Sequence, residues 1–588
     1  MAQDISFEVV ATHLGAGHFR EARNELLRVA NTRRTDPSHY DALLADTELQ
    51  LGLLDSAAAR AEAILREPQV SARHAAAAHR VLAEIAAGDL NFEASCTHYE
   101  AARHAYSAAK SNSLAASVEL SFWARFSGVL PLETAVSEFR TVRTTVLRSG
   151  SPQHLAELRL CTARIEARKN CIIEAERHWQ CAQRLLDSNP NAKLFAQSHL
   201  DACMLRILRA DWDGALRHAE EASKAAEASG HCRSRVGALI DAAHILHARG
   251  ELADAKQFAE RALGDARSLR HLHVAALDCL ANILLSTGDI SGAEAACEQI
   301  ANLRPRHGTR LASHWDVLSE LATRVSIARS RNSHLETVEL INQGLHTARA
   351  SRDHAWLARM ELACATELLT SGQANEAVVP LSRALSYDNP PPELLARVCA
   401  TLDVASAALG ENRSRAASQR GHRIAGALGS RVLEAELSQV GQRPTPPATV
   451  ALSSLDDAVA LIELAGYPHV LAREAYALLQ LTGAASAVAL VARSDRLRCI
   501  EAQGWTENHA LRVAADPAHR LHIVCGQHRE ETWEIVAELK PALADRCAGV
   551  AVRKLVDTAV TLDRYRREEK QRLGDQGGLQ LQGPALRP

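Results

Sequence analysis

The sequence predicts a mainly α-helical chain: an α-solenoid of helical hairpins, then a small α+β domain and a long C-terminal helix. Two observations predict this fold. One glycine–alanine phrase recurs along residues 1–440, and short alternating apolar runs replace it beyond a proline-rich stretch. The length of 588 residues, too great for one ordinary core, also favours an extended array or several domains.

The recurring phrase is clearest at 250–263, GELADAKQFAERAL, where alanines follow Gly250 after five residues (Ala255) and after twelve (Ala262). Similar phrases occur at 17–22 (GHFREA), 288–293 (GDISGA) and 372–377 (GQANEA). The equivalent turn positions lie 35 to 43 residues apart, at Gly17, Gly52, Gly88, Gly128, Asn170, Ala210, Gly250, Gly288, Arg331, Gly372 and Gly410. The units at 128, 331 and 410 are assigned mainly by this spacing.

Each unit has the pattern of two helices joined by a tight turn. Apolar residues between Val236 and Leu246 form one helical stripe, and those between Leu252 and Leu263 form a second. Gly250 ends the first helix, since glycine tolerates the left-handed conformation of a helix C-terminus. Alanine on the second helix lets the two backbones approach closely. Because one hairpin cannot bury both of its faces, the hairpins are expected to stack.

Composition agrees with closely packed helices and argues against several classes of partner. Apolar residues make up 47% of the chain but aromatic residues only 4%. Lys and Arg number 67 against 70 Asp and Glu, so the basic excess of a nucleic-acid-binding protein is absent and no direct nucleic acid binding is expected. The N-terminus has no signal-peptide pattern, and no apolar run suits a membrane span. Thirteen cysteines without a CxxC motif indicate a reduced, cytoplasmic protein.

The glycine, the alanines at plus five and plus twelve, and a proline near plus seventeen resemble the tetratricopeptide repeat (TPR). The resemblance covers roughly residues 10–430, although most steps exceed the family's usual ~34 residues. It implies a TPR-like array of about eleven hairpins over 1–440, with protein partners on the helical repeat surface.

The pattern changes at 441–450, where GQRPTPPAT predicts a proline-rich linker. Beyond it we expect an α+β domain with exit helix over 451–573, and a disordered tail over 574–588. Leu455–Gln480 is expected to be helical, and strands are expected at 485–492, 497–503 and 520–526. From Glu530 the chain is expected to be helical again, with a new helix from Pro541 to about Gln571.

The stretch LLQLTGAASAVALVARSDRLRCIEAQGW is similar to the GAF-like segment that follows helical repeats in some bacterial sigma-54-dependent regulators. DRYRREEKQRL at 563–573 resembles the connector to their AAA+ domain, but no GxxxxGK[ST] loop is present. The resemblance implies a small-molecule ligand in the GAF-like domain and assigns no binding residue. A stripe on the exit helix is either a homodimer seam or a face packed on its own sheet: Val552, Val556, Ala559, Leu562 and Tyr565.

No catalytic or metal-binding motif stands out. The nearest histidine groups are HILH at 244–247 and HLH at 271–273, interpreted as ordinary helix histidines, and HExxH and GxSxG are absent. Cys161, Cys171 and Cys181 are interpreted as small buried apolar residues rather than a metal or redox cluster. Trp505 either covers a sensor pocket or belongs to the domain core. Cys499 and Cys525 lie on expected strands.

These observations favour a non-enzymatic regulatory or signalling protein in bacterial transcription regulation, which uses no cofactor. Its repeats would bind protein, and its GAF-like module would sense a ligand or dimerise. The alternative is a TPR scaffold without ligand sensing. A third hypothesis is an enzyme whose site lies between the two regions.

Overall fold

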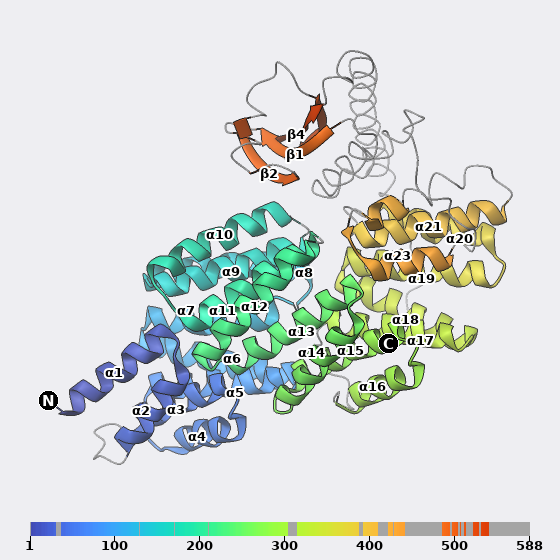
Figure 1. The fold of residues 1–588 in the computed structure, drawn as a ribbon. Helices are drawn as coiled ribbons and strands as arrows, with labels where there is room; N and C mark the ends of the chain where they lie inside the picture. Colours follow the sequence, from blue (N-terminus) through green and yellow to red (C-terminus); the bar gives the residue numbers. More distant parts are fainter. Residues whose placement is uncertain are drawn as a thin grey trace, which may run out of the picture. The chain divides into compact units, whose positions relative to one another are not determined.

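The structure is a computed structural model (Figure 1). It describes residues 2–30, 37–128, 130–169, 171–209, 211–303, 314–386, 392–409, 421–426, 428–440, 485–493, 497–503, 506, 511–512, 521–528 and 531–539. The expected linker, the helix at 455–480, the exit helix, the tail and Trp505 lie outside these residues. The domain bounds given above stay a prediction.

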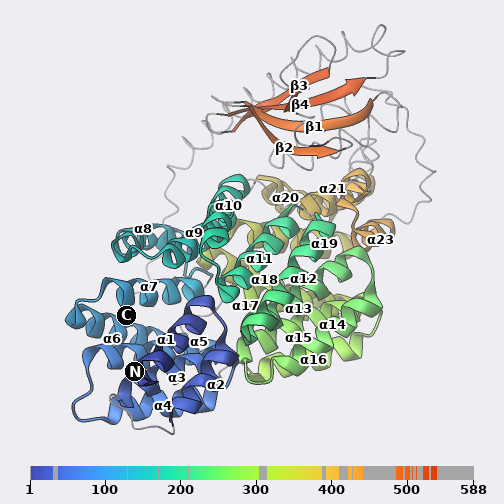
Figure 2. The same cartoon turned by 60° about the vertical axis from the view of Figure 1, so that its left-hand side comes forward.

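The described helices pair as antiparallel hairpins, from α1/α2 to α19/α20 (Figure 2). The first helices of the pairs are α1 Ala2–Ala16, α3 Pro37–Leu51, α5 Ala72–Gly88, α7 Asn112–Phe126, α9 Pro152–Arg168, α11 Ala192–Leu208, α13 Cys232–Arg249, α15 Arg270–Ser286, α17 His314–Ser330 and α19 His354–Thr370. Their partners are α2 Phe19–Ala30, α4 Leu54–Arg66, α6 Phe92–Ala109, α8 Leu132–Ser149, α10 Ile172–Ser188, α12 Trp212–Ser229, α14 Leu252–Asp265, α16 Ile290–Leu303, α18 His334–Ser351 and α20 Ala374–Ser386. Two further helices are α21 Pro392–Ala408 and α23 Arg431–Val440.

In the hairpins that carry the glycine–alanine phrase, the joint is built as expected. Gly250 caps α13 in the left-handed conformation, with φ 80°. The alanines five and twelve residues past the turn are completely buried, which confirms the close helix crossing: Ala22, Ala57, Ala175, Ala182, Ala215, Ala222, Ala255, Ala262, Ala293, Ala377 and Ala384. Neighbouring hairpins also contact one another, so the array stacks as a TPR-like helical repeat solenoid.

Two of the expected turn positions are wrong by one or two residues. After α5 the left-handed residue is Leu90 rather than Gly88, and after α17 it is Asn332 rather than Arg331. Asparagine adopts this conformation more readily than other non-glycine residues. Leucine has no such preference for the left-handed conformation. The Leu90 side chain is buried in the core, and this burial offsets the cost of the backbone conformation.

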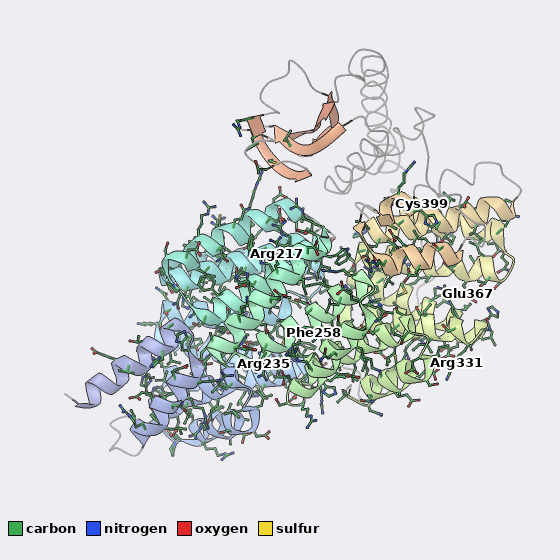
Figure 3. All side chains as sticks on the ribbon, in the orientation of Figure 1. Arg217, Arg235, Phe258, Arg331, Glu367 and Cys399 are labelled. Atoms are coloured by element: carbon green, nitrogen blue, oxygen red, sulfur yellow. The ribbon has the colours of Figure 1, made fainter. Side chains whose placement is uncertain are left out.

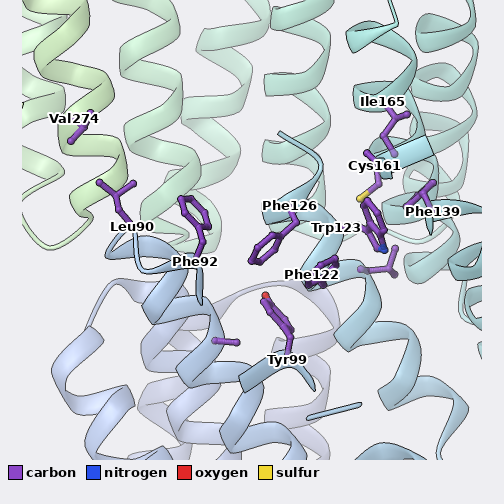
Figure 4. Close-up of a cluster of buried hydrophobic side chains, with 14 of the residues drawn as sticks. Leu90, Phe92, Tyr99, Phe122, Trp123, Phe126, Phe139, Cys161, Ile165 and Val274 are labelled. Atoms are coloured by element: carbon purple, nitrogen blue, oxygen red, sulfur yellow. The ribbon is translucent and has the colours of Figure 1, made fainter. Parts of the chain in front are cut away.

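The weak repeat unit near Gly128 has a different kind of core. Tyr99 of α6, Phe122, Trp123 and Phe126 of α7, and Phe139 of α8 are buried together (Figure 4). The Tyr99 and Phe122 rings meet edge to face, with centroids 5.4 Å apart. Large aromatic side chains therefore fill the space between the helices that small alanines fill in other units. This explains why the glycine–alanine phrase is weak in this unit.

The C-terminal described segments form an antiparallel sheet of four strands, in the order β2-β1-β4-β3. They are β1 Ala485–Arg493, β2 Leu497–Gln503, β3 Leu521–His528 and β4 Glu531–Leu539. The three expected strands are confirmed, but the expectation of helix from Glu530 is wrong. Residues 531–539 alternate apolar and polar side chains at several positions, and β4 pairs with both β1 and β3. Its pairing on both sides decides the strand conformation.

The chain divides into two compact units. One comprises Met1–Tyr387 with Gly429–Leu433, and the other comprises Asp388–Leu428 with Glu434–Pro588. Within the described residues, none of the helices has the length and apolar character required to cross a membrane.

Candidate functional site: a charged junction between successive turns of the array

The helical array winds back on itself within the first unit. The carboxyl end of α1 meets the amino end of α11: the Gly15 carbonyl accepts hydrogen bonds from Asn191 Nδ2 (2.9 Å) and from Gln153 Nε2 (2.7 Å). In the same way α5 meets α15, where His271 Nδ1 lies 3.3 Å from the Gly88 carbonyl oxygen. The first helices α1 and α5 thus each meet the first helix that lies five hairpins later along the chain.

Two of the turn glycines are required by this contact as well as by their conformation. A Cβ atom on Gly17 would lie 2.7 Å from Asn191 Oδ1 and 2.9 Å from the Lys193 backbone nitrogen. A Cβ atom on Gly52 would lie 2.9 Å from Cys232 Sγ. Both glycines have positive φ, at 73° and 81°. Glycine therefore serves the hairpin turn and the approach of the next winding at once.

A buried carboxylate, Glu84 of α5, lies where two windings meet, and we call its surroundings the Glu84 junction. Arg125 of α7 donates from Nε to Glu84 Oε2 over 2.8 Å, and Tyr99 donates its hydroxyl to Oε1 over 3.0 Å. Arg233 of α13 donates from Nη1 to the same carboxylate and from Nη2 to the Glu84 carbonyl oxygen over 3.0 Å. Glu84 and Arg233 are 149 residues apart in sequence, and both are buried.

The electrostatics of the Glu84 junction keep the carboxylate charged. Burial opposes its ionisation, but Arg125, with Arg80 and Lys193 nearby, outweighs burial and lowers the pKa of Glu84 below its ordinary value. Burial raises the pKa of Tyr99 well above its ordinary value, so its hydroxyl remains a donor. Burial, aided by the Arg125 charge, lowers the pKa of His271 to about 4.

The Glu84 junction is therefore a network of positive groups around one carboxylate. A second ion pair lies close by, between Arg80 Nη2 and Asp46 Oδ1 at 2.8 Å. Because the guanidinium groups bond the carboxylate and tyrosine stays protonated, the arrangement holds helices in register. Removing one member of such a buried network leaves the others without a partner, which is costly.

The two histidine groups noted in the sequence lie on different helices, α13 and α15. His244 is exposed on α13, and His247 Nε2 lies 2.8 Å from Ser286 Oγ. His271 joins the contact with Gly88, whereas burial lowers the pKa of His273 while its bond to the Ala266 backbone opposes that change. In the part of the chain that the structure describes, no group of three or more His, Cys, Asp or Glu side chains is placed to hold a metal ion.

The cysteine expectations are partly wrong. Cys161 is completely buried, but Cys171 precedes α10 at its N-cap, and both it and Cys181 are only half-buried. The sheet order puts Cys499 and Cys525 on opposite edge strands, β2 and β3. His528 and Glu531 are register partners in the antiparallel β3–β4 pair, so no helix begins there.

Sequence reasoning missed the Glu84 junction. Glu84, Arg125 and Arg233 look like ordinary helix charges, and no local spacing relates them. The repeat itself was the available signal. Charged residues of distant units can be matched from the sequence only when the number of hairpins in one winding is known, and the sequence does not give that number.

Comparison with known proteins finds structural likeness alone. No protein-family model matches the chain, and no curated protein matches it. A Rap protein complexed with competence and sporulation factor is 14% identical, with a TM-score of 0.45 over 63% of this chain and 100% of that one. The apo quorum sensor NprR from B. thuringiensis is 12% identical, with a TM-score of 0.39 over 64% and 99%. Yeast Tom70 is 11% identical, with a TM-score of 0.32 over 69% and 88%. These are helical-repeat structures, and at such values the likeness carries no argument about function.

Proposed function

We propose that this chain is a non-enzymatic regulatory protein whose helical-repeat unit binds a protein partner. The observation that carries the proposal is a set of large apolar side chains exposed on the second helices of two consecutive hairpins, which we call the α18/α20 surface. Leu335 and Val338 of α18 are 90% and 46% exposed, and Val378 and Val379 of α20 are 37% and 52% exposed. Large apolar side chains left exposed on consecutive hairpins are available for contact with another protein.

The core of these two hairpins is complete without the exposed side chains, which favours a role for them in binding. The inward residues of the same hairpins, such as Ile341 and Ala377, are already buried. Polar contacts join the neighbouring helices, where buried Glu367 of α19, labelled in Figure 3, accepts from His334 Nδ1 at 2.7 Å and from Arg329 Nε at 3.4 Å. The exposed side chains thus add little to the core, and a partner that covered them would remove apolar area from water.

The test is capture of partners from extracts of the source cells with the full-length chain. A Leu335→Glu, Val379→Glu variant places two charges on the α18/α20 surface and should lose a partner that the wild type retains. Leu147→Glu is the control, since Leu147 is 55% exposed on α8, in a different part of the array. A partner held equally by all three chains, or none held by the wild type, would contradict the proposal.

The finer part of the proposal concerns regulation. We place the protein in bacterial transcription regulation, with the region of the sheet as a GAF-like module that senses a ligand or dimerises. The antiparallel sheet β2-β1-β4-β3 and the sequence resemblance support this assignment. A ligand would then act by shifting the population between two arrangements of the chain.

A scaffold without ligand sensing is the second candidate, and the stacked repeats favour it equally. Thermal unfolding of the full chain with a small-molecule library distinguishes the two. A compound that raises the unfolding midpoint of the wild type supports sensing, because a ligand that binds only the folded state stabilises it. A library without such a compound supports the scaffold.

A further inference from the structure

One position of the hairpin, where the first helix crosses the second, holds facing side chains 19 residues apart. We call these the crossing pairs. Asp41 and Arg60 form an ion pair there in α3/α4, with 3.2 Å between Oδ1 and Nη1. Leu239 and Phe258 belong to one apolar cluster in α13/α14. Figure 3 labels Phe258. The repeat thus brings together two side chains at a fixed geometry, and their chemistry differs from unit to unit.

Two of the crossing pairs consist of histidines. In α11/α12, His199 Nδ1 and His218 Nδ1 are 3.0 Å apart. In α5/α6, His79 Nδ1 and His98 Nδ1 are 3.2 Å apart. The ring centroids of the two pairs lie 5.3 Å and 5.4 Å apart. All four rings are half-buried, so water and small ions reach them.

We propose that each histidine crossing pair is a two-nitrogen clasp for a divalent transition-metal ion such as Ni²⁺, beyond the partner binding proposed above. Imidazole is a preferred ligand of Ni²⁺, Cu²⁺ and Zn²⁺. Nitrogens at about 2.05 Å from an ion and separated as these are subtend roughly 90° to 105° at the metal. The smaller angle belongs to the His199–His218 pair and suits a square-planar or octahedral ion, whereas the larger angle, at His79–His98, is closer to the tetrahedral value. Water would complete the coordination.

The His199–His218 clasp is held in place before any ion binds. Trp179 packs edge-on against the His218 ring, with centroids 5.6 Å apart, and its Nε1 donates to the Ser198 carbonyl over 3.0 Å. Without metal, one Nδ1 hydrogen bonds to the other. If both rings carry their proton on Nε2, two Nδ1 lone pairs face the ion and no net proton is lost. Burial lowers the pKa of His199 and His218, which favours the neutral rings that bind metal.

The chain contains its own control for this clasp. Between the two histidine pairs, α9/α10 carries Arg159 opposite His178, with Nη1 and Nδ1 3.2 Å apart. Arginine has no lone pair for a metal, yet the hairpin forms with it at the crossing position. His199→Arg and His79→Arg therefore reproduce a pairing that the fold accepts, and Arg159→His creates a third histidine pair.

The experiment is equilibrium dialysis of the full-length chain against Ni²⁺, with bound ions counted per chain. His199→Arg and His79→Arg should each lose one ion and together lose two, whereas Arg159→His should gain one. His104→Gln, which removes an exposed histidine of α6 outside the crossing pairs, should change nothing. Circular dichroism checks that each variant is folded. Equal stoichiometry in all folded variants, or no gain in Arg159→His, would overturn the proposal.

Discussion

At the scale of the residue, the repeat depends on small side chains at helix crossings. Ala255 of α14 has no exposed surface and lies in a cluster with Ala243 and Ala259. Well-packed positions of this kind tolerate little extra volume, since added methylene groups force side chains and backbone to move. The alanine thus sets the distance between the two helices.

Ala255→Leu should therefore lower the free energy of unfolding by about 1–3 kcal/mol, because the crossing would be overpacked. Urea unfolding followed by circular dichroism measures the change. Ala253→Leu, at an exposed position two residues earlier on the same helix, is the matched control and should be within about 0.5 kcal/mol of the wild type. If both substitutions have equal effects, the crossing is not tightly packed.

At the scale of the element, the hairpin fixes which side chains face each other, but leaves their chemistry free. The crossing pairs are an ion pair in α3/α4, histidine pairs in α5/α6 and α11/α12, arginine with histidine in α9/α10, and an apolar pair in α13/α14. A histidine pair makes the hairpin sensitive to acid. Burial first, and then the charges of His199, Arg206 and Arg217, lower the pKa of His218 to about 4.

The sign of the pH effect follows from that lowered pKa. In the unfolded chain His218 takes up a proton near pH 6.5, whereas in the folded chain it takes up a proton only near pH 4. Stability that the pair contributes at neutral pH is therefore lost as the pH falls from 6.5 towards 4. Partial exposure and screening reduce the loss to about 1–2 kcal/mol.

His199→Leu, His218→Phe copies the apolar pair Leu239/Phe258 of a neighbouring hairpin and should remove much of this acid sensitivity. Thermal unfolding midpoints at pH 7 and pH 4.5, without added metal, measure it. The wild type should lose more stability between the two pH values than the variant does. An identical loss in both chains would show that other groups cause the acid response.

At the scale of the whole molecule, the first unit is held by contacts between windings as well as between neighbouring hairpins. The Glu84 junction joins α5, α7 and α13, and Asn191 and His271 bond to turn carbonyls of the previous winding. A repeat array with contacts only between neighbours would unfold piecewise, whereas contacts across about 150 to 180 residues make distant hairpins depend on each other.

Glu84→Gln should consequently destabilise the unit by about 3–5 kcal/mol, since it leaves the buried Arg233 and the partly buried Arg125 without a carboxylate. Hydrogen exchange should rise at the amino end of α13 as well as in α5, although the two are far apart in sequence. Glu119→Gln breaks a pair with Arg103 that joins adjacent hairpins, at 2.7 Å, and should affect α6 and α7 alone. Exchange confined to α5 in the Glu84 variant would mean that the windings are independent.

The sequence by itself determined the hairpins, their glycine turns and their alanine crossings, because these depend on residues close together in the chain. It also predicted three of the four strands, the first from a continuous apolar run and the second from alternating residues. It did not predict β4, where pairing with two neighbours outweighs a glutamate-rich stretch, nor the aromatic core around Trp123. Only the tertiary structure decided which hairpins meet after a full winding, and hence the Glu84 junction. Small rotations between successive hairpins add up over the array. The total rotation decides which hairpins meet across windings, and no local sequence pattern contains it.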